Sequence, residues 1–219
     1  MWIPANASIV VRLIFRDMSF RLLHRDALQP ITDHFKMKII SPTLDDGNLL
    51  QQAAQLLMDA FHEHWPDAWS TFDEALKEIH EMLEAERICR AALDDDGNLL
   101  GIIGGIPTYD GNVWELHPLA VQPNMQGQGI GRALVEDFEE QVRMRGGLTI
   151  TLGSDDEDNM TSLSEVNLFE NTWEKIQNIR NVKNHPFTFY QKLGYVITGV
   201  VPHANGIGKP DILMSKSVK

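Results

Sequence analysis

Apolar residues recur with helical spacing in three parts of the chain. They fall every three to four positions over Leu49–Phe61, and Pro66 prevents that helix from continuing. Thr71 and Glu74 have capping-box spacing, so a second helix begins after them. A third amphipathic stretch, Gly129–Arg145, ends at a pair of glycines. The pattern therefore predicts three main helices, each with one buried face.

Shorter apolar runs between turn residues predict the strands. The turn Asp95-Asp96-Gly97-Asn98 joins two of these runs in a hairpin, and His185-Pro186 begins a further helix because proline suits the first helical position. The predicted strands are Lys38–Ser41, Ile88–Leu93, Leu99–Ile106, Val113–Val121, Leu148–Leu152, Tyr195–Val201 and Asp211–Ser215. Strands and helices in this order predict an α/β or α+β domain built around a mixed sheet.

The start of the chain differs from the remainder, so we divide it into an N-terminal extension, residues 1–36, and one domain, residues 37–219. In the extension, apolar and basic residues alternate without a clear period. Arg12 and Arg16 interrupt the apolar stretch, which argues against a secretory signal. Two interpretations remain: a start site assigned too far upstream of Met37, or a real extension that packs on the domain or on a partner.

The charge balance limits the partners of the protein. It has 31 acidic and 19 basic residues, a net charge of −12, and no basic cluster that could meet the phosphates of a nucleic acid. An acidic surface attracts polycations, although the same excess of charge can serve solubility alone. No apolar run approaches the roughly 18 residues of a membrane-spanning helix. We therefore expect neither nucleic acid nor membrane as a partner.

Cys89 is the only cysteine, so the chain cannot form an intrachain disulfide. Nothing therefore indicates an oxidising compartment, and we expect a cytoplasmic protein. Cys89 stands in a short apolar run and is interpreted as a buried filler rather than a nucleophile. His62-Glu63-His64 lacks the spacing of a metal site, and we expect no metal.

The stretch with the most specific chemistry is a strand, a loop with three alternate glycines and an amphipathic helix. Gly127, Gly129 and Gly131 let backbone N–H groups approach an anion, and the helix adds free donors and the positive end of its dipole. A Walker loop would need Lys where Arg132 stands, and a dinucleotide fingerprint would need its third glycine one position later. The loop therefore predicts another kind of pyrophosphate cradle, with a glycine-rich turn without a ligand as the alternative.

Gln126-x-x-Gly129-x-Gly131 after Val-Gln-Pro resembles the acetyl-CoA signature of the GNAT superfamily, and Phe189-Tyr190 to Gly194-Tyr195 is similar to its second CoA motif. The resemblance implies a GNAT fold, with a central mixed, mostly antiparallel twisted sheet flanked by helices, and acetyl-CoA as co-substrate. It implies that the loop amides bind the pyrophosphate and that the preceding strand pairs with the pantetheine arm. The residues that it assigns to acetyl-CoA are Leu119, Ala120, Val121, Gln126, Gly127, Gln128, Gly129, Ile130, Gly131, Arg132, Tyr190 and Lys192.

Five further blocks resemble the chromosomally encoded aminoglycoside 6′-N-acetyltransferases, in unbroken order over residues 37–217. They are Trp114-Glu115-Leu-His117-Pro118-Leu, Gly146-Gly147-Leu-Thr-Ile, Leu152-Gly153-Ser-Asp155-Asp156, His185-Pro186-Phe-Thr-Phe-Tyr190 and Ala204-Asn205-Gly206 with Lys209-Pro210-Asp211-Ile212. This resemblance implies transfer to the 6′-amine of an aminoglycoside, a role in antibiotic resistance, and a homodimer. The glycine loop departs from some members of the subgroup, which carry polar residues in place of glycines, and this supports the acetyl-CoA assignment.

Acyl transfer to an amine requires removal of a proton, stabilisation of the carbonyl oxygen and protonation of the leaving thiolate. Without a well-placed cysteine, direct attack of the amine in a ternary complex is simpler than an acyl-enzyme. Glu115 is the first candidate base, directly or through a water, and a surface strand carboxylate is the alternative. His117, two residues on and on the same strand face, relays the proton or is structural. By family analogy Tyr190 is the acid, with core packing as the alternative, and N–H groups near Val121 polarise the carbonyl.

Carboxylates and aromatic residues supply the predicted substrate site. The acidic loop that begins at Asp155 and ends at Asp158, with Asp211 and Glu115, suits a substrate that bears several ammonium groups. A solvated charge run is the alternative interpretation of that loop. Trp65 and Asp67, with Trp69, stand between the first two helices and form either a lid or a packed loop.

Two other functions remain open. The same chemistry can act on another amine, such as a polyamine, a free amino acid, or a lysine or N-terminus of a protein. A CoA-binding protein without catalysis belongs to a different class, and the presence of both Glu115 and Tyr190 argues against it.

Overall fold

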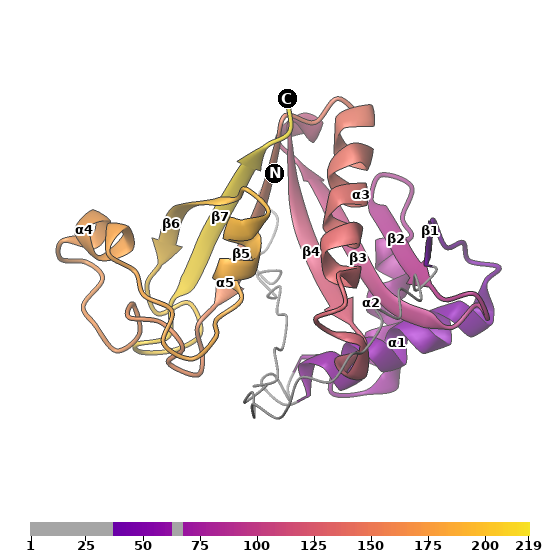
Figure 1. Cartoon of the computed structure of the whole chain (residues 1–219), viewed down its shortest axis with the longest axis horizontal. Coiled ribbons are helices and arrows are strands. Elements are labelled where there is room, and N and C mark those ends of the chain that lie inside the picture. Colours follow the sequence, from indigo (N-terminus) through magenta and orange to yellow (C-terminus); the bar gives the residue numbers. More distant parts are fainter. Residues whose placement is uncertain (1–36, 63–67) are drawn as a thin grey trace, which may run out of the picture.

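A seven-stranded sheet forms the centre of the protein in this computed structural model, which describes residues 37–62 and 68–219 (Figure 1). The strands are β1 (Lys38–Ile40), β2 (Ile88–Leu93), β3 (Leu99–Thr108), β4 (Val113–Val121), β5 (Thr149–Asp155), β6 (Val196–Val201) and β7 (Asp211–Ser217). Their order is β1-β2-β3-β4-β5-β7-β6, and only the β4–β5 pair is parallel. This confirms the predicted mixed, mostly antiparallel sheet. The predicted extension, residues 1–36, lies outside the described residues.

Helices pack on both faces of the sheet. The helices are α1 (Gly47–Phe61), α2 (Phe72–Met82), α3 (Ile130–Met144), α4 (Thr172–Gln177) and α5 (Phe187–Lys192). The first two share a core on one face, and α3 and α5 share a core on the other, while α4 contacts β6 (Figure 1). The predicted capping box is confirmed: Glu74 N–H donates to Thr71 Oγ1 at 3.3 Å, and Thr71 N–H donates to Glu74 Oε2 at 3.1 Å. Sequence reasoning missed α4, because Ile176 is its only buried side chain and no apolar period marks it.

The two cores are separate because side chains alternate across β3 and β4. Ile102 and Ala120 face α1 and α2, whereas Ile103 and Leu119 face α3. Burial of an aliphatic side chain contributes about 1.5–3 kcal/mol, so the two cores account for the docking of these helices on the sheet.

Two glycines on β3 let neighbouring elements approach its backbone closely. A Cβ atom on Gly105 would lie 2.2 Å from Cε2 of Phe138, and one on Gly104 would lie 2.3 Å from the carbonyl oxygen of His117. Opposite these glycines β4 contains a bulge, because Gly105 pairs with Leu116 while Ile103 pairs with Leu119. The extra residue falls at His117-Pro118, whose peptide bond is cis. Because they lack a side chain, the two glycines allow α3 and the bulge that contains His117 to pack closely against β3.

The pairing of β4 with β5 is confined to the start of both strands. Val113, Trp114 and Glu115 pair with Thr149, Ile150 and Thr151. Beyond that point the two strands diverge (Figure 1), while β3 continues to pair with β4 as far as Val121 and β7 pairs with β5 as far as Asp155. The sheet therefore splits into two halves, and the β5-facing edge of residues 116–121 has no strand partner among the residues that the structure describes.

Helix α3 connects the two halves of the sheet through two ion pairs. On one side Asp137 accepts hydrogen bonds from Arg90 Nε and Nη2 of β2 at 2.6 and 2.9 Å. On the other side Glu139, whose side chain is 4% exposed, accepts from Lys216 Nζ of β7 at 2.6 and 2.7 Å. Paired, hydrogen-bonded charges of this kind are costly to break, so α3 holds the divergent halves in a set relation.

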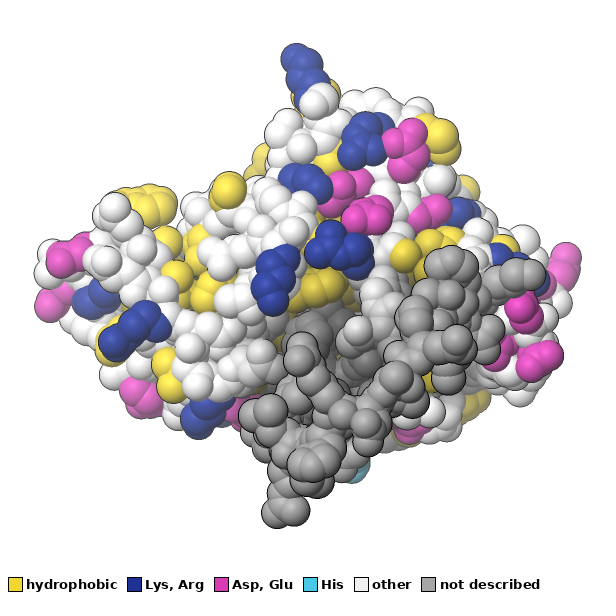
Figure 2. All heavy atoms as spheres, in the orientation of Figure 1, with side chains coloured by type: hydrophobic (Ala, Val, Ile, Leu, Met, Phe, Trp, Pro, Cys, Tyr) yellow, Lys and Arg dark blue, Asp and Glu magenta, His cyan; other side chains and the backbone are white. Residues whose placement is uncertain are grey.

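Charge is unevenly distributed over the surface. Figure 2 shows both signs interspersed along α3 and acidic side chains gathered at the end of the molecule near the start of α1. There the exposed Asp45 and Asp46 border a hollow of about 340 Å³, which Gly97 of the β2–β3 turn also lines. Acidic side chains therefore gather at this end of the face that Figure 2 shows, and others lie at the opposite end.

We expect Gly105→Ala to lower the free energy of unfolding by about 1–3 kcal/mol, because the added methyl group would collide with the Phe138 ring. Gly47→Ala is the matched control: it begins α1, and its Cβ would meet nothing within 4 Å. Urea unfolding of the two variants beside the wild type measures the difference. Equal midpoints for Gly105→Ala and the wild type would contradict the close packing of α3 on β3.

Candidate functional site

The loop between β4 and α3 presents its backbone openly. Gly127 and Gly129 have φ angles of +77° and +89°, in the left-handed region that disfavours other residues. A Cβ atom on either glycine would meet nothing within 4 Å, so the need for glycine here comes from the backbone conformation. The Gln126 side chain does not reach outward; its Nε2 donates to the carbonyl of Val121 at 3.4 Å and ties the loop to the end of β4.

The N-terminus of α3 supplies free donors. Its first helical hydrogen bond is donated by Ala133 N–H to Gly129 at 3.0 Å, and no side chain caps the helix. The N–H groups of Ile130, Gly131 and Arg132 precede that bond, so they have no partner within the helix. No acidic residue lies in the first turn, and the helix dipole favours an anion there. Backbone donors on an open, left-handed loop fit an anion such as a pyrophosphate.

The side chains predicted for the co-substrate differ in exposure. Leu119, Ala120 and Val121 are buried, so only their backbone can meet a ligand, on the edge that faces β5. Ile130 is also buried, and Gln128 is exposed with Nε2 3.6 Å from Met125 Sδ. The remaining charged side chains are on the surface: Arg132 lies 3.4 Å from Glu136, and Lys192 is exposed at the end of α5.

Glu115 and Asp211 lie on the face of the sheet opposite α3. Trp114 and Leu116 belong to the core under α3, so Glu115 between them points to the other face. Burial raises the pKa of Glu115, and the negative charge of Asp211 raises it further. The two carboxylates thus come together from β4 and β7, as a shared substrate site requires.

Asp211 is an unusually buried carboxylate. Its side chain is 4% exposed, burial raises its pKa to about 6, and Oδ1 has no hydrogen-bond partner within the described residues. It lies against the backbone of Gly153, where a Cβ atom would be 2.5 Å from Asp211 Oδ2. Sequence reasoning did not identify this role of Gly153, although the glycine stands in one of the blocks that carry the resemblance.

The acidic loop is only partly a solvated run. Asp156 is fully buried, and its carboxylate accepts from Thr161 N–H and Oγ1 at 2.8 and 2.6 Å, from Met160 N–H at 2.5 Å and from the Ser164 hydroxyl. Asp156 therefore stabilises the conformation of the loop. The interpretation of Asp156 as a solvated or substrate-binding charge is wrong. Asp158 is exposed, which agrees with the alternative interpretation of a solvated charge run.

Asp155 ends β5 and is buried. Its carboxylate accepts from the Asn205 amide, and its carbonyl oxygen lies 3.0 Å from His185 Nε2. It shares the sheet face of Asp211, its partner in the β5–β7 register. Asp155 thus links two loops beside the candidate site, and its contact with substrate stays a prediction.

His117 contacts a carboxylate that sequence reasoning missed. Its Nε2 lies 3.7 Å from Oε1 of Glu78 on α2, and its ring lies 6.3 Å from that of Trp69. This contact places His117 on the same face as Glu115, as predicted. The signal for Glu78 was present in the sequence, because it occupies the buried stripe of α2 between Ala75 and Met82.

Tyr190 combines core packing with an unused donor. It is fully buried on α5, and its ring packs edge-to-face on Tyr195 at 5.6 Å. Its hydroxyl has no hydrogen-bond partner within the described ranges. Burial raises the pKa of Tyr190 well above its usual value, so the phenol keeps its proton at neutral pH.

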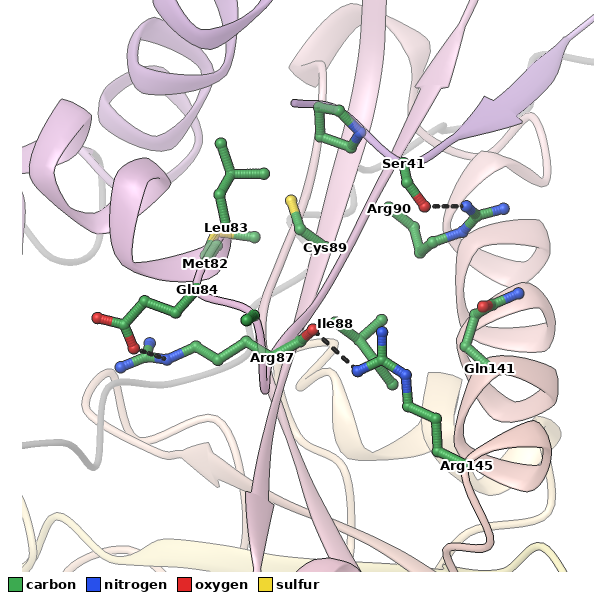
Figure 3. A pocket seen from close by; sticks show the side chains of 12 residues that line it. Ser41, Met82, Leu83, Glu84, Arg87, Ile88, Cys89, Arg90, Gln141 and Arg145 are labelled. Carbon is green, nitrogen blue, oxygen red and sulfur yellow. Dashed lines mark hydrogen bonds and ion pairs between the residues drawn. The ribbon is translucent and has the colours of Figure 1, made fainter. Parts of the chain in front are cut away.

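A cavity of about 170 Å³ between α2, β2 and α3 is lined by three arginines (Figure 3). It does not suit the cationic substrate that the sequence predicts. Arg87 pairs with Glu84 at 3.2 Å, and Asp137 holds Arg90. Arg145 donates to the carbonyl of Arg87 at 2.9 Å. The protein's own groups therefore engage these side chains, and the cavity offers no carboxylate free to bind an ammonium group.

Cys89 lines the same cavity and is 8% exposed (Figure 3). Burial raises the pKa of its thiol to about 12, so it stays protonated and unreactive at neutral pH. This confirms the interpretation of Cys89 as a buried filler.

The predicted lid residues have different outcomes. Trp69 is buried and packs edge-to-face on Phe61 at 4.9 Å, whereas Trp65 and Asp67 lie outside the described residues. Over residues 37–62 and 68–219, no group of three or more His, Cys, Asp or Glu side chains is placed to hold a metal ion. In the same ranges, no helix has the length and apolar character needed to cross a bilayer.

The Acetyltransferase (GNAT) family profile matches residues 50–169. Two solved structures are 42% identical over 83% of this chain and 97% of theirs: an aminoglycoside 6′-N-acetyltransferase complexed with coenzyme A, at a TM-score of 0.77, and the aminoglycoside 6′-N-acetyltransferase from Enterococcus faecium, at 0.75. An aminoglycoside 6′-acetyltransferase type Ii is 37% identical over the same shares, at 0.64. No curated protein sequence matches the chain. The matched profile and this identity over most of the chain, on a sheet that divides between β4 and β5, show that the chain belongs to the GNAT family of acetyltransferases.

Proposed function

We propose that the protein transfers the acetyl group of acetyl-CoA to the 6′-amine of aminoglycosides and so confers resistance to them. The observation that carries this proposal is the carboxylate pair Glu115 and Asp211. Both are largely buried, and neither has an ion-pair partner over residues 37–62 and 68–219. An ammonium group 4 Å from one carboxylate gains about 4 kcal/mol near a protein surface before desolvation, so a polycationic substrate would offset the cost of burying them. The similar structures are aminoglycoside 6′-N-acetyltransferases, and they support an aminoglycoside as this polycationic substrate.

The unpaired edge of β4 and the N-terminus of α3 would hold acetyl-CoA. The backbone of Leu119–Val121 would pair with the pantetheine arm, and the free N–H groups of Ile130 and Gly131 would bind the pyrophosphate. The co-substrate supplies an acetyl group activated as a thioester. Through this placement the thioester would lie between β4 and β5, near Glu115.

In the proposed mechanism Glu115 takes the proton of the substrate ammonium, directly or through a water. Its raised pKa makes it a stronger base than an exposed carboxylate. The free amine attacks the acetyl carbon, the new C–N bond forms as the C–S bond breaks, and N–H groups near Val121 stabilise the carbonyl oxygen. The Tyr190 hydroxyl donates a proton to the departing thiolate and is reprotonated by the second proton that the nitrogen loses as the amide forms. The mechanism is a direct attack in a ternary complex, because the buried thiol of Cys89 stays protonated and is not available as a nucleophile.

The resemblance also carries two proposals about the protein in the cell. We propose that it acts as a homodimer and in the cytoplasm, where acetyl-CoA is available. A polyamine, amino acid or protein amine as substrate, or CoA binding without catalysis, would be outcomes of the experiments that follow.

Release of thiol from acetyl-CoA in the presence of different amines tests the proposed substrate. Kanamycin and amikacin, which carry a 6′-amine, should be acetylated, whereas an analogue with a 6′-hydroxyl, spermidine and a lysine peptide should be poor substrates. Mapping of the acetylated position by NMR should find the 6′-nitrogen. Acetylation of the 3-amine would rule out the 6′-assignment, and turnover only with spermidine would rule out aminoglycosides.

Glu115→Gln should lower kcat/KM about 100-fold or more, because general bases typically contribute 10²–10⁴ and the amide keeps the size of the side chain. Glu140→Gln, on the exposed surface of α3 beside Arg143, is the control and should retain activity. Steady-state kinetics with kanamycin measure the effect. Near wild-type activity of Glu115→Gln would show that another group, such as His117, is the base.

Asp211→Asn should stabilise the free protein above pH 6 while it impairs substrate binding. The folded-state pKa near 6 lies above the unfolded value of 3.8, so wild-type stability falls as pH rises through this window, by at most about 3 kcal/mol. Asn removes that loss. Urea unfolding should therefore show a gain for the variant at pH 7 and little difference at pH 4. Loss of a hydrogen bond to a charged group should raise the KM for kanamycin about 10-fold. A KM equal to that of the wild type would show that Asp211 does not contact the substrate.

A further inference from the structure

The contact between Glu78 and His117 connects α2 to the candidate catalytic strand. Glu78 Oε1 lies 3.7 Å from His117 Nε2, and the two side chains are 15% and 5% exposed. His117 stands on the bulge of β4, opposite Gly104, which admits the His117 carbonyl. The contact therefore depends on the packing of a helix against a strand that is far from it in the sequence.

The position of Glu78 is costly for a residue with only a structural role. It lies in the stripe of α2 that otherwise buries Ala75, Ile79 and Met82. Burial raises the pKa of its carboxyl, and the charge of Glu81 adds to that effect, against smaller opposing effects from Arg87, Trp69 and Lys77. An apolar side chain at this position would avoid the desolvation of a carboxylate. Within the described part of the chain, His117 is the group that lies within ion-pair distance of Glu78, and it is charged only when it is protonated.

The position of His117 allows the Glu78 carboxylate to take part in proton transfer. His117 shares the strand face of Glu115, two residues away, so the imidazole can receive a proton from the base. An imidazole must release one nitrogen proton to a partner in order to expose a basic lone pair at the other nitrogen. Glu78 stands at Nε2, and catalytic hydrogen bonds that are long in a free enzyme shorten when the site is filled.

We propose that Glu78 is a positioning residue for the acetyl transfer. It accepts a hydrogen bond from Nε2–H of His117 and thereby places the basic lone pair on Nδ1. The substrate proton passes from the ammonium group to Glu115 and then to His117, whose imidazolium is stabilised by the Glu78 carboxylate until the proton leaves to solvent. In this relay only the bonds to the transferred proton form and break. The role rests on the proposed acetyltransferase function and extends the catalytic machinery from the sheet to α2.

Other charged groups near this pair set the background for any titration. Glu115 lies on β4 itself, and Asp211 acts on Glu115 from β7. On α2 and after it, Lys77, Glu81 and Arg87 act on Glu78. Asp59 of α1 and His62, which follows that helix, line a hollow of about 420 Å³ that Trp69 also borders. All of these groups remain in place when Glu78 alone is changed.

The first test uses the full-length protein without substrate. The pKa of His117 is measured by NMR titration of the histidine ring signals, assigned with His117→Gln. Glu78→Gln should lower the pKa of His117 by about one unit, because an opposite charge within 4–6 Å favours the protonated form. Glu78→Asp should restore most of the wild-type value, and Glu84→Gln, which changes a surface partner of Arg87, should leave it unchanged. An unchanged pKa in Glu78→Gln would overturn the proposal.

The second test measures kinetics with whichever amine the enzyme acetylates. Glu78→Gln should lower kcat about 10-fold or more, leave the KM for acetyl-CoA unchanged, and move the acidic limb of the kcat/KM profile to lower pH. In a His117→Gln background the same change should have little further effect. Equal losses in both backgrounds, or an effect on the aminoglycoside KM alone, would overturn the proposal, and the latter would make Glu78 a direct substrate ligand.

The two tests separate this proposal from the proposed function. If kanamycin is not a substrate, the NMR titration still decides whether Glu78 controls His117. If Glu78→Gln does not fold, Glu78→Ala provides the same test, because it also removes the carboxylate. A folded Glu78→Ala protein whose His117 pKa and pH profile equal those of the wild type would refute the positioning role.

Discussion

Strands β4 and β5 pair at Val113–Glu115 and then separate, and the rest of the site depends on this break. A strand in the middle of a sheet ordinarily uses its N–H and C=O groups on both edges, and such groups are costly when buried without partners. From Leu116 to Val121, β4 bonds to β3 on one edge, and within residues 37–62 and 68–219 its other edge has no strand partner. An extended ligand could take the place of a strand there. The candidate base stands at the last paired position, where the opening begins.

Helix α3 keeps the two halves of the sheet apart and also supplies the donors at the end of the opening. It packs on Gly105 through Phe138, and Asp137 and Glu139 join it to Arg90 and Lys216 on opposite halves. The same helix begins at the left-handed Gly129, where its first N–H groups are free. One element therefore sets the geometry of the opening and the position of the free backbone donors. A shift of α3 would change both together.

The candidate site contains carboxylates whose burial disfavours the charged form. Glu78, Glu115 and Asp211 have raised pKa values because they are buried, and Asp211 reaches about 6. Asp156, in contrast, is buried with four donors and stabilises its loop. Hydrogen bonds within the loop compensate the burial of Asp156, whereas burial is the largest effect on the pKa of Glu78, Glu115 and Asp211. The two hydrophobic cores supply stability that offsets the cost of burying these carboxylates.

The sequence by itself determined the features whose physics is local. The helices and strands followed from apolar spacing, the capping box from Thr71 and Glu74, and the glycine loop from residues that are contiguous in the chain. The structure confirmed these because helix periodicity, caps and turns depend on neighbours a few residues apart. The polar helix α4 was missed for the same reason, since it has no apolar period to reveal it.

Only the tertiary structure decided which distant side chains meet. The approach of Asp211 to Glu115, the contact of Glu78 with His117 and the burial of Asp156 depend on strand register and helix docking. These are set by long-range pairing and by close backbone contacts such as those at Gly105 and Gly153. A one-residue change of register would send each strand side chain to the opposite face, and nothing local to Glu115 or Asp211 encodes their shared face.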